Sequence, residues 1–192
     1  MAQVRERAIV ARRLAVDLAA ATLFAVLTAA GARLSFHVPF TPVPITGQVL
    51  CVLLAGGVLG ARLGFVSQVE YLAAGAAGLP IFAHGGGPAA LLGPTGGYLV
   101  GFPLAALVVG SIAGRSRAQA GWRVLLACLC GVIVIHACGA AWFAVWRAMT
   151  GSGAGLLAVL AQSLFPFVAV DAVKAAAAAA LIPAMRRRLP PG

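Results

Sequence analysis

Charged residues are scarce in this chain, and acidic ones are the scarcest. Only 9% of the 192 residues are charged, with 4 Asp and Glu against 14 Lys and Arg, whereas soluble domains average about 25%. Hydrophobic residues make up 62% of the chain, and the mean hydropathy is +1.02. This composition excludes a soluble domain. Apolar runs of about the length of a bilayer crossing predict an all-α integral membrane protein.

Signatures of nucleotide and metal chemistry are also missing. The Gly-rich stretch 83–97 lacks the Lys-Ser/Thr ending of a phosphate-binding loop. Cys128 and Cys130 do not have the spacing of a Cys-x-x-Cys motif, and no second ligand pair follows them. We therefore expect the cysteines to be small packed residues, and we expect no cofactor, no metal site and no ATPase site.

An intramembrane enzyme is the least favoured class of function. His136 and Cys138 stand two residues apart in one predicted helix, so they point to different faces and do not form a nucleophile–base pair. His136 is expected to be packed or to face a pore. An enzyme that uses Asp171, Lys174 and His136 is kept as an alternative, but we predict no enzyme and assign no catalytic residue.

The apolar runs predict six transmembrane helices. They are separated by Gly, Pro and Arg punctuation and cover residues 14–34, 46–59, 63–79, 98–113, 124–146 and 156–185. The predicted domains are a basic cytoplasmic segment at 1–13, a six-helix membrane domain at 14–185 and a basic cytoplasmic tail at 186–192. The second span is short for a crossing.

The arginines predict that both termini lie in the cytoplasm of a multi-pass cell-membrane protein. Positive residues gather in cytoplasmic loops, and this orientation leaves only Arg33 and Arg147 outside. The cytoplasmic side then holds eleven: Arg5, Arg7, Arg12, Arg13, Arg62, Arg115, Arg117, Arg123, Arg186, Arg187 and Arg188. The net charge of +10 thus faces anionic headgroups of the lipid bilayer, and no nucleic-acid partner is expected.

Asp171 and Lys174 are the most informative residues, because both lie inside the hydrophobic run 164–182. An ionised side chain at membrane depth costs from about 2.5 to well over 10 kcal/mol. At positions i and i+3 the two share a helical face and can partly neutralise each other. We predict that they face a polar pocket; the alternative is an internal salt bridge that only fixes helix packing.

Two connections between spans and one helix face also carry sequence patterns that point to function. Pro39, Pro42 and Pro44 stiffen the connection after the first span, and the Gly-rich stretch 83–97 permits close backbone approach to a ligand. Ala21 and Ala25 begin a small-xxx-small stripe on the first span. That stripe predicts either a docking face for another subunit or packing against a neighbouring span.

Four blocks together closely resemble the BioY family, the substrate-binding S components of energy-coupling-factor (ECF) biotin transporters. They are Pro-Phe-Thr-Pro-Val-Pro-Ile-Thr-Gly-Gln at 39–48, Gly-Ala-Ala-Gly-Leu-Pro-Ile-Phe-Ala at 75–83, Gly-Pro-Thr-Gly-Gly-Tyr at 93–98 and the Asp171-x-x-Lys174 pair. The resemblance implies an ECF S-component-like bundle that binds biotin from outside. The substrate-binding residues it implies are Asp171, Lys174, Phe40, Thr46, Gln48, Tyr71, Gly86 and Tyr98.

The same resemblance implies partner subunits, and it also shows where this chain departs from the family pattern. It implies a membrane coupling subunit (T component) and two ATPase subunits, with Ala21 and Ala25 as docking residues; function as a homo-oligomer is the alternative. Another vitamin in place of biotin also stays open. Some relatives have an Asn where this chain has His84-Gly-Gly-Gly. We expect His84 or backbone N–H donors to make the polar contact that the missing Asn amide would make with the ligand. Glu70 is expected to partner Lys174, face the pocket or lie near a helix end.

Overall fold

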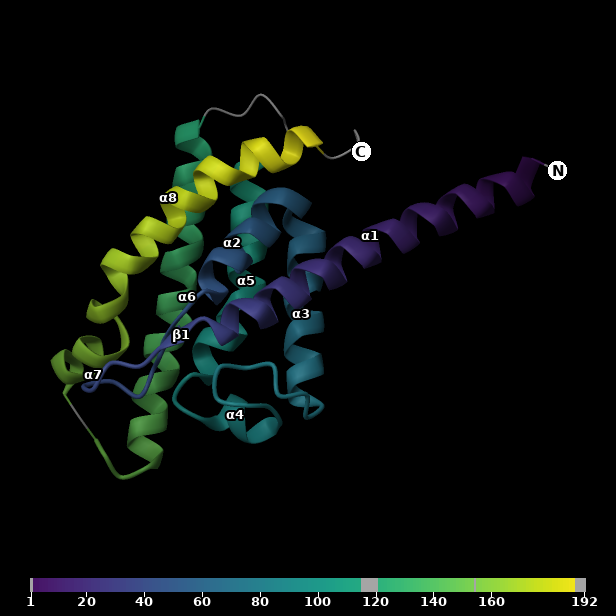
Figure 1. The fold of residues 1–192 in the computed structure, drawn as a ribbon. Coiled ribbons are helices and arrows are strands. Elements are labelled where there is room, and N and C mark those ends of the chain that lie inside the picture. Colours follow the sequence, from purple (N-terminus) through teal and green to yellow (C-terminus); the bar gives the residue numbers. More distant parts are fainter. Residues whose placement is uncertain (1, 115–120, 154, 189–192) are drawn as a thin grey trace.

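The computed structural model describes residues 2–114, 121–153 and 155–188. These residues form eight helices and one two-stranded antiparallel sheet (Figure 1). In chain order they are α1 Ala2–Arg33, β1 Ser35–Phe36, β2 Ile45–Thr46, α2 Gln48–Leu59, α3 Ala61–Ala76, α4 Pro88–Leu92, α5 Gly96–Ala113, α6 Gly121–Met149, α7 Leu156–Ser163 and α8 Phe165–Arg188. The all-α class therefore holds.

The predicted count of six spans needs correction. Within the described residues, four helical segments are long and apolar enough to cross a membrane: Glu6–Arg33, Gly96–Ala113, Gly121–Met149 and Leu156–Arg188. Helix α2 has 12 residues and rises only about 18 Å, against a hydrocarbon core of about 30 Å. Helix α3 has 16 residues and includes Arg62, Gln68 and Glu70. Both predicted segments are helices, but they fall below that length.

Two further boundaries differ from the prediction. Helix α1 begins at Ala2 rather than at residue 14, and its N-terminal part projects away from the other helices (Figure 1). The predicted last span is two helices, because the chain breaks at Leu164, between α7 and α8. Pro166 lies in the first turn of α8, where a missing N–H leaves no hydrogen bond unmade. The break lets α7 turn away from the axis of α8.

Helices α2, α3 and α5 are in backbone contact because glycines without a side chain lie where they meet. A Cβ on Gly110 of α5 would lie 2.2 Å from the Ala61 nitrogen, and one on Gly56 of α2 would lie 2.3 Å from the Ala106 oxygen. In lipid, where the hydrophobic effect does not drive helices together, such close packing is the main source of association. Any side chain at either position would force these helices apart.

Arginines gather at one end of the molecule. The α2–α3 turn, the start of α6 and the end of α8 lie together at the top of Figure 1, while α4, α7 and the strands lie at the opposite end. Arg62, Arg123 and Arg186–188 belong to the first group, and Arg33 and Arg147 to the second. Arg115 and Arg117, which the orientation also uses, lie outside the described residues, as do residues 189–192.

Orientation is tested by labelling single cysteines. In a chain with its four native cysteines replaced, Gln3→Cys and Pro190→Cys should be protected from an impermeant maleimide in intact cells, because the arginine-rich end faces the cytoplasm. Gly153→Cys, in the connection between α6 and α7, is the matched control and should react. Rapid labelling of position 3 or 190 would mean that the orientation is inverted.

Candidate functional site

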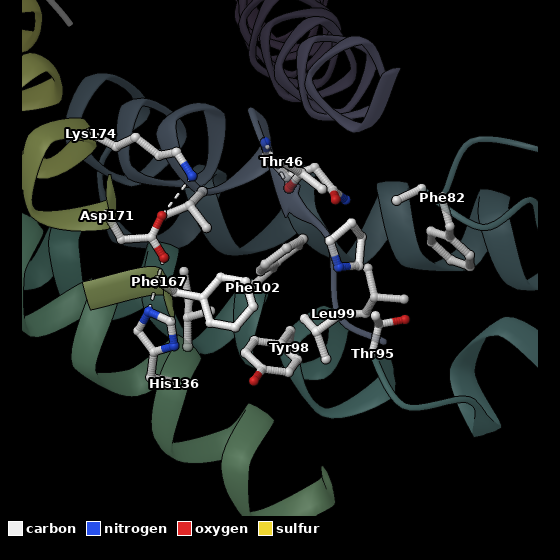
Figure 2. A pocket seen from close by; sticks show the side chains of 16 residues that line it. Thr46, Phe82, Thr95, Tyr98, Leu99, Phe102, His136, Phe167, Asp171 and Lys174 are labelled. Atoms are coloured by element: carbon white, nitrogen blue, oxygen red, sulfur yellow. Dashed lines mark hydrogen bonds and ion pairs between the residues drawn. The ribbon is translucent and has the colours of Figure 1, made fainter. Parts of the chain in front are cut away.

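A pocket lies between α2, α5, α6 and α8, beneath the chain that leads into β2 (Figure 2). The free space inside it is about 50 Å³, well below the range of about 300–1,000 Å³ that small-molecule sites occupy, so its side chains have to move apart to admit a ligand. Most of the wall is apolar and comes from Val49, Leu99, Phe102, Ile135 and Phe167. The few polar groups are therefore the ones that can orient a ligand.

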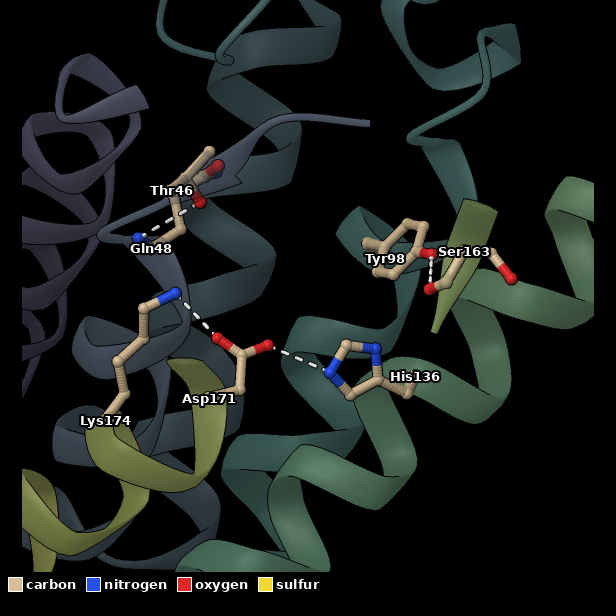
Figure 3. A network of polar contacts seen from close by, with 7 residues as sticks. All are labelled: Thr46, Gln48, Tyr98, His136, Ser163, Asp171 and Lys174. Atoms are coloured by element: carbon tan, nitrogen blue, oxygen red, sulfur yellow. Dashed lines mark hydrogen bonds and ion pairs between the residues drawn. The ribbon is translucent and has the colours of Figure 1, made fainter. Parts of the chain in front are cut away.

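Three of these polar groups form one network (Figure 3). The Lys174 ammonium donates to Asp171 Oδ1 at 2.6 Å, and Nε2 of His136 lies 2.9 Å from Asp171 Oδ2. The Asp171 side chain is 3% exposed, and those of His136 and Lys174 are 7% and 15% exposed. A carboxylate this deeply buried is stable only where hydrogen-bond donors pair with its oxygens. Here α8 and α6 each supply one.

The Gly-Pro-Thr-Gly-Gly-Tyr block positions Tyr98 at the pocket. Trp142 of α6 donates to the Gly93 carbonyl at 2.8 Å, and a Cβ on Gly97 would lie 2.3 Å from that of Trp142. On α6, Gly139 leaves room for the Tyr98 ring, and the Tyr98 hydroxyl donates to the Ser163 carbonyl. The glycines of this block thus serve the close packing of α5 against α6.

The connection between β1 and β2 covers the pocket and is held at both sides. Ser35 pairs with Thr46 and Phe36 with Ile45 at its base. At its far side, the Thr41 hydroxyl donates to the Gln162 carbonyl of α7 at 2.6 Å. The same hydroxyl accepts from the Val43 N–H at 3.1 Å. This connection, residues 37–44, is called the outer loop below.

Five of the predicted site residues line the pocket: Asp171, Lys174, Thr46, Gln48 and Tyr98. Tyr71 does not line it; it is fully buried behind Gln48, whose amide donates to its hydroxyl at 2.7 Å. Phe40 lies on the outer loop, is 60% exposed and does not reach the pocket.

A second hollow lies beside the pocket. Gly86 lines this hollow rather than the pocket, with His84, Pro42 and the Gly93-Pro94-Thr95 stretch. Thr95 borders both spaces. His84 lines this second hollow and not the pocket. It is therefore not placed to replace, inside the pocket, the Asn side chain that some relatives have in this stretch.

His136 is the functional residue that sequence reasoning placed least well. It was expected to be packed or to face a pore, and in the structure it is both buried and part of the pocket wall. An ionisable residue at membrane depth is itself a signal of function. Its contact with Asp171, 35 positions away, depends on how α6 packs against α8. Within the described residues, no group of three or more His, Cys, Asp or Glu side chains is placed to hold a metal ion.

Glu70, Ala21 and Ala25 lie away from the pocket, where α1 packs on the bundle. Glu70 accepts a hydrogen bond from the Thr22 hydroxyl of α1 at 3.0 Å, so it meets neither Lys174 nor the pocket. Ala21 and Ala25 are 0% and 8% exposed. Their small size lets α1 pack closely within the chain, and docking of another subunit on them stays a prediction.

A sequence profile described as the BioY family matches residues 4–191. The chain belongs to the BioY family. A relative from Pyrococcus horikoshii named "Probable biotin transporter BioY" is 44% identical over 157 residues, which are 81% of this chain and 87% of that protein. The "Biotin transporter BioY" of Rhizobium etli is 36% identical over 174 residues, covering 86% and 90%.

One solved structure has the same fold as this BioY-family chain. It is described as the S-component for biotin from an ECF-type ABC transporter. The TM-score is 0.82 with 26% sequence identity, and the alignment covers 93% of this chain and 94% of the other. The resemblance seen in the sequence motifs is confirmed, and so is the all-α membrane class.

Two histidines join the outer loop to the segment between α3 and α4. The rings of His37 and His84 meet edge to face with centroids 5.4 Å apart. Burial, and then the neighbouring His37, lower the pKa of His84, while a hydrogen bond with the Pro42 backbone acts in the opposite direction. The contact thus favours neutral His84.

Acidification should therefore loosen the outer loop. Because burial and the neighbouring His37 lower its pKa in the folded chain, His84 stabilises the contact above its ordinary pKa of about 6.5, and this stabilisation is lost as the pH falls from that value through the lowered pKa. Limited proteolysis of the outer loop should accelerate between pH 7.5 and 5.5. His84→Gln should abolish this change; an unaltered pH dependence in that variant would contradict the interpretation.

Proposed function

We propose that this chain is a biotin-binding membrane subunit that mediates biotin uptake into the cell. The observation that carries the proposal is the buried Asp171–Lys174 pair, which lies in the wall of an apolar pocket in a chain of the BioY family. Of the relatives named above, one is described as a probable biotin transporter and the other as a biotin transporter. A charged pair at membrane depth needs a ligand or a partner that repays its desolvation.

The chemistry of the pocket suits the two parts of biotin. A ureido ring offers N–H donors to the Asp171 carboxylate and a carbonyl acceptor to the Lys174 ammonium, and hydrogen bonds to charged groups are the strong ones. The thiophane ring and the acyl chain are apolar and match the side chains of Leu99, Phe102 and Phe167. Gln48 and Thr46 offer further polar contacts near the outer loop.

Energised uptake requires partners in this proposal. A membrane coupling subunit and two ATPase subunits would supply the work, since the sequence carries no nucleotide-binding signature. We place the docking surface on the lipid-facing side of α1, where Leu23, Val26 and Leu27 are exposed. Ala21 and Ala25 lie beneath it and set how closely α1 packs. A homo-oligomer that uses the same face is the alternative.

Equilibrium binding of labelled biotin to the purified chain tests the proposed function. We expect a nanomolar-scale dissociation constant in detergent and in lipid nanodiscs. Unlabelled biotin should compete, whereas thiamine and riboflavin should not. The absence of binding at micromolar biotin would refute the proposal, and effective competition by either other vitamin would assign a different substrate.

The charged pair is tested by three variants. Asp171→Asn leaves Lys174 without its partner, and Lys174→Met leaves the carboxylate alone. Truncating one member of a buried, hydrogen-bonded charge pair costs about 2–5 kcal/mol, so each change should weaken biotin binding by roughly 30-fold or more.

The double variant Asp171→Asn/Lys174→Met is the control for a purely structural role. If the pair contacts the ligand, the double variant should fold, as judged by its melting temperature, and still fail to bind biotin. If the pair serves packing alone, the double variant should regain both stability and affinity, and that result would remove Asp171 and Lys174 from the site.

A further inference from the structure

His136 reaches the charge pair from a different helix. It lies on α6, whereas Asp171 and Lys174 both lie on α8. Its Nε2 is 2.9 Å from Asp171 Oδ2, the carboxylate oxygen that Lys174 does not use. The rings of Tyr98 and Phe167 pack beside the imidazole, with centroids 6.1 and 6.0 Å away. Two neighbouring aromatic rings therefore pack against the imidazole, whose Nε2 is directed at Oδ2.

The burial of the second ring nitrogen favours a proton on Nε2. Nδ1 of His136 is buried and has no hydrogen-bond partner within the described residues. A doubly protonated ring would bury an unpaired N–H donor there and would add a positive charge beside Lys174. With a neutral ring that is protonated on Nε2, His136 donates to Asp171, and the three side chains carry no net charge.

The two donors to Asp171 differ in their freedom. Lys174 ends a flexible four-carbon stem one turn along the same helix, so its ammonium can turn toward a ligand. His136 is buried among aromatic rings and holds its place. A carboxylate anchored by His136 stays oriented and partnered when Lys174 turns away. Without that anchor, engaging Lys174 would leave the buried carboxylate with too few donors.

We propose that His136 is a positioning residue for ligand binding, which acts by holding the Asp171 carboxylate. The inference rests on the proposed function, because it needs a ligand that offers N–H donors to Asp171 and an acceptor to Lys174. His136 itself need not touch the ligand: its Nε2 faces Asp171 (Figure 3). The role can therefore be measured as coupling between substitutions of His136 and Asp171 in their effects on ligand affinity.

Two amide variants form a matched pair for the test. In His136→Gln the side-chain Nε2 stands about as far from the backbone as the histidine Nε2 and can still donate to Asp171. In His136→Asn the amide is one methylene shorter and falls short of Oδ2. Labelled biotin binding is measured on both variants and on His136→Leu, with melting temperatures. Val132→Ala, one turn away on α6 and buried outside the pocket, is the packing control.

We expect His136→Asn and His136→Leu to weaken biotin binding by about 10-fold or more, the loss typical of one hydrogen bond to a charged group. His136→Gln should bind within about 3-fold of the wild type. Val132→Ala should lower the melting temperature and leave the affinity unchanged. In an Asp171→Asn background, His136→Asn should have little further effect, because its partner is already gone.

Each contrary result has a distinct meaning. If the wild type binds biotin and His136→Asn binds equally well, or if His136→Gln is as weak as His136→Asn, the positioning role is wrong. The same holds if the effects of His136→Asn and Asp171→Asn multiply. If the wild type does not bind biotin at all, the proposed function fails, and the positioning role fails with it.

Discussion

The carboxylate of Asp171 sets the constraint on which the pocket depends. A nearly fully buried carboxylate inside a membrane protein must receive hydrogen bonds from the protein itself, because no water is available to replace them. Here one donor comes from the same helix and one from α6. The relative rotation of α6 and α8 is therefore fixed by the side chains of Asp171 and His136, and with it the orientation of the pocket wall.

The packing of α5 follows from the same region. Gly139 lies one turn beyond His136 on α6 and leaves space for the Tyr98 ring, which reaches across to the Ser163 carbonyl at the end of α7. The break at Leu164 follows directly and sets where α8 begins. Thus α5, α6, α7 and α8 meet around one aromatic side chain. The outer loop is tied to α7 through Thr41, so the cover of the pocket is attached to the same group of helices.

The sequence predicted the chemistry of the site better than its shape. Asp171 and Lys174 could be found because charge inside an apolar run is visible in one dimension, and the motif blocks led to Thr46, Gln48 and Tyr98. Tyr71 and Phe40 were also expected at the site, but the sequence does not show whether an aromatic ring is in the wall, behind it or outside it. His136 was grouped with Asp171 and Lys174 only in the enzyme alternative, since the contact with Asp171 spans two helices.

Helix lengths were the other feature that the sequence did not predict correctly. Hydropathy located each segment, yet it did not show that α2 ends after 12 residues or that α1 begins at Ala2. Helix α2 is short because Gly60, with φ of 83°, turns the chain sharply into α3. Such an end depends on backbone conformation, and an average over apolar residues does not detect it.

Arg186 ties three helices together at the arginine-rich end of the molecule. This buried arginine donates to the carbonyls of Gly57 and Gly114, at the ends of α2 and α5, and so joins three helices at the arginine-rich end. These carbonyls carry the partial negative charge of helix C-termini. At the opposite end, the outer loop covers the pocket and contributes Val43 and Pro44 to its lining. A solute can therefore reach the pocket by displacing that loop, whereas leaving at the other end requires α8 to part from α2 and α5.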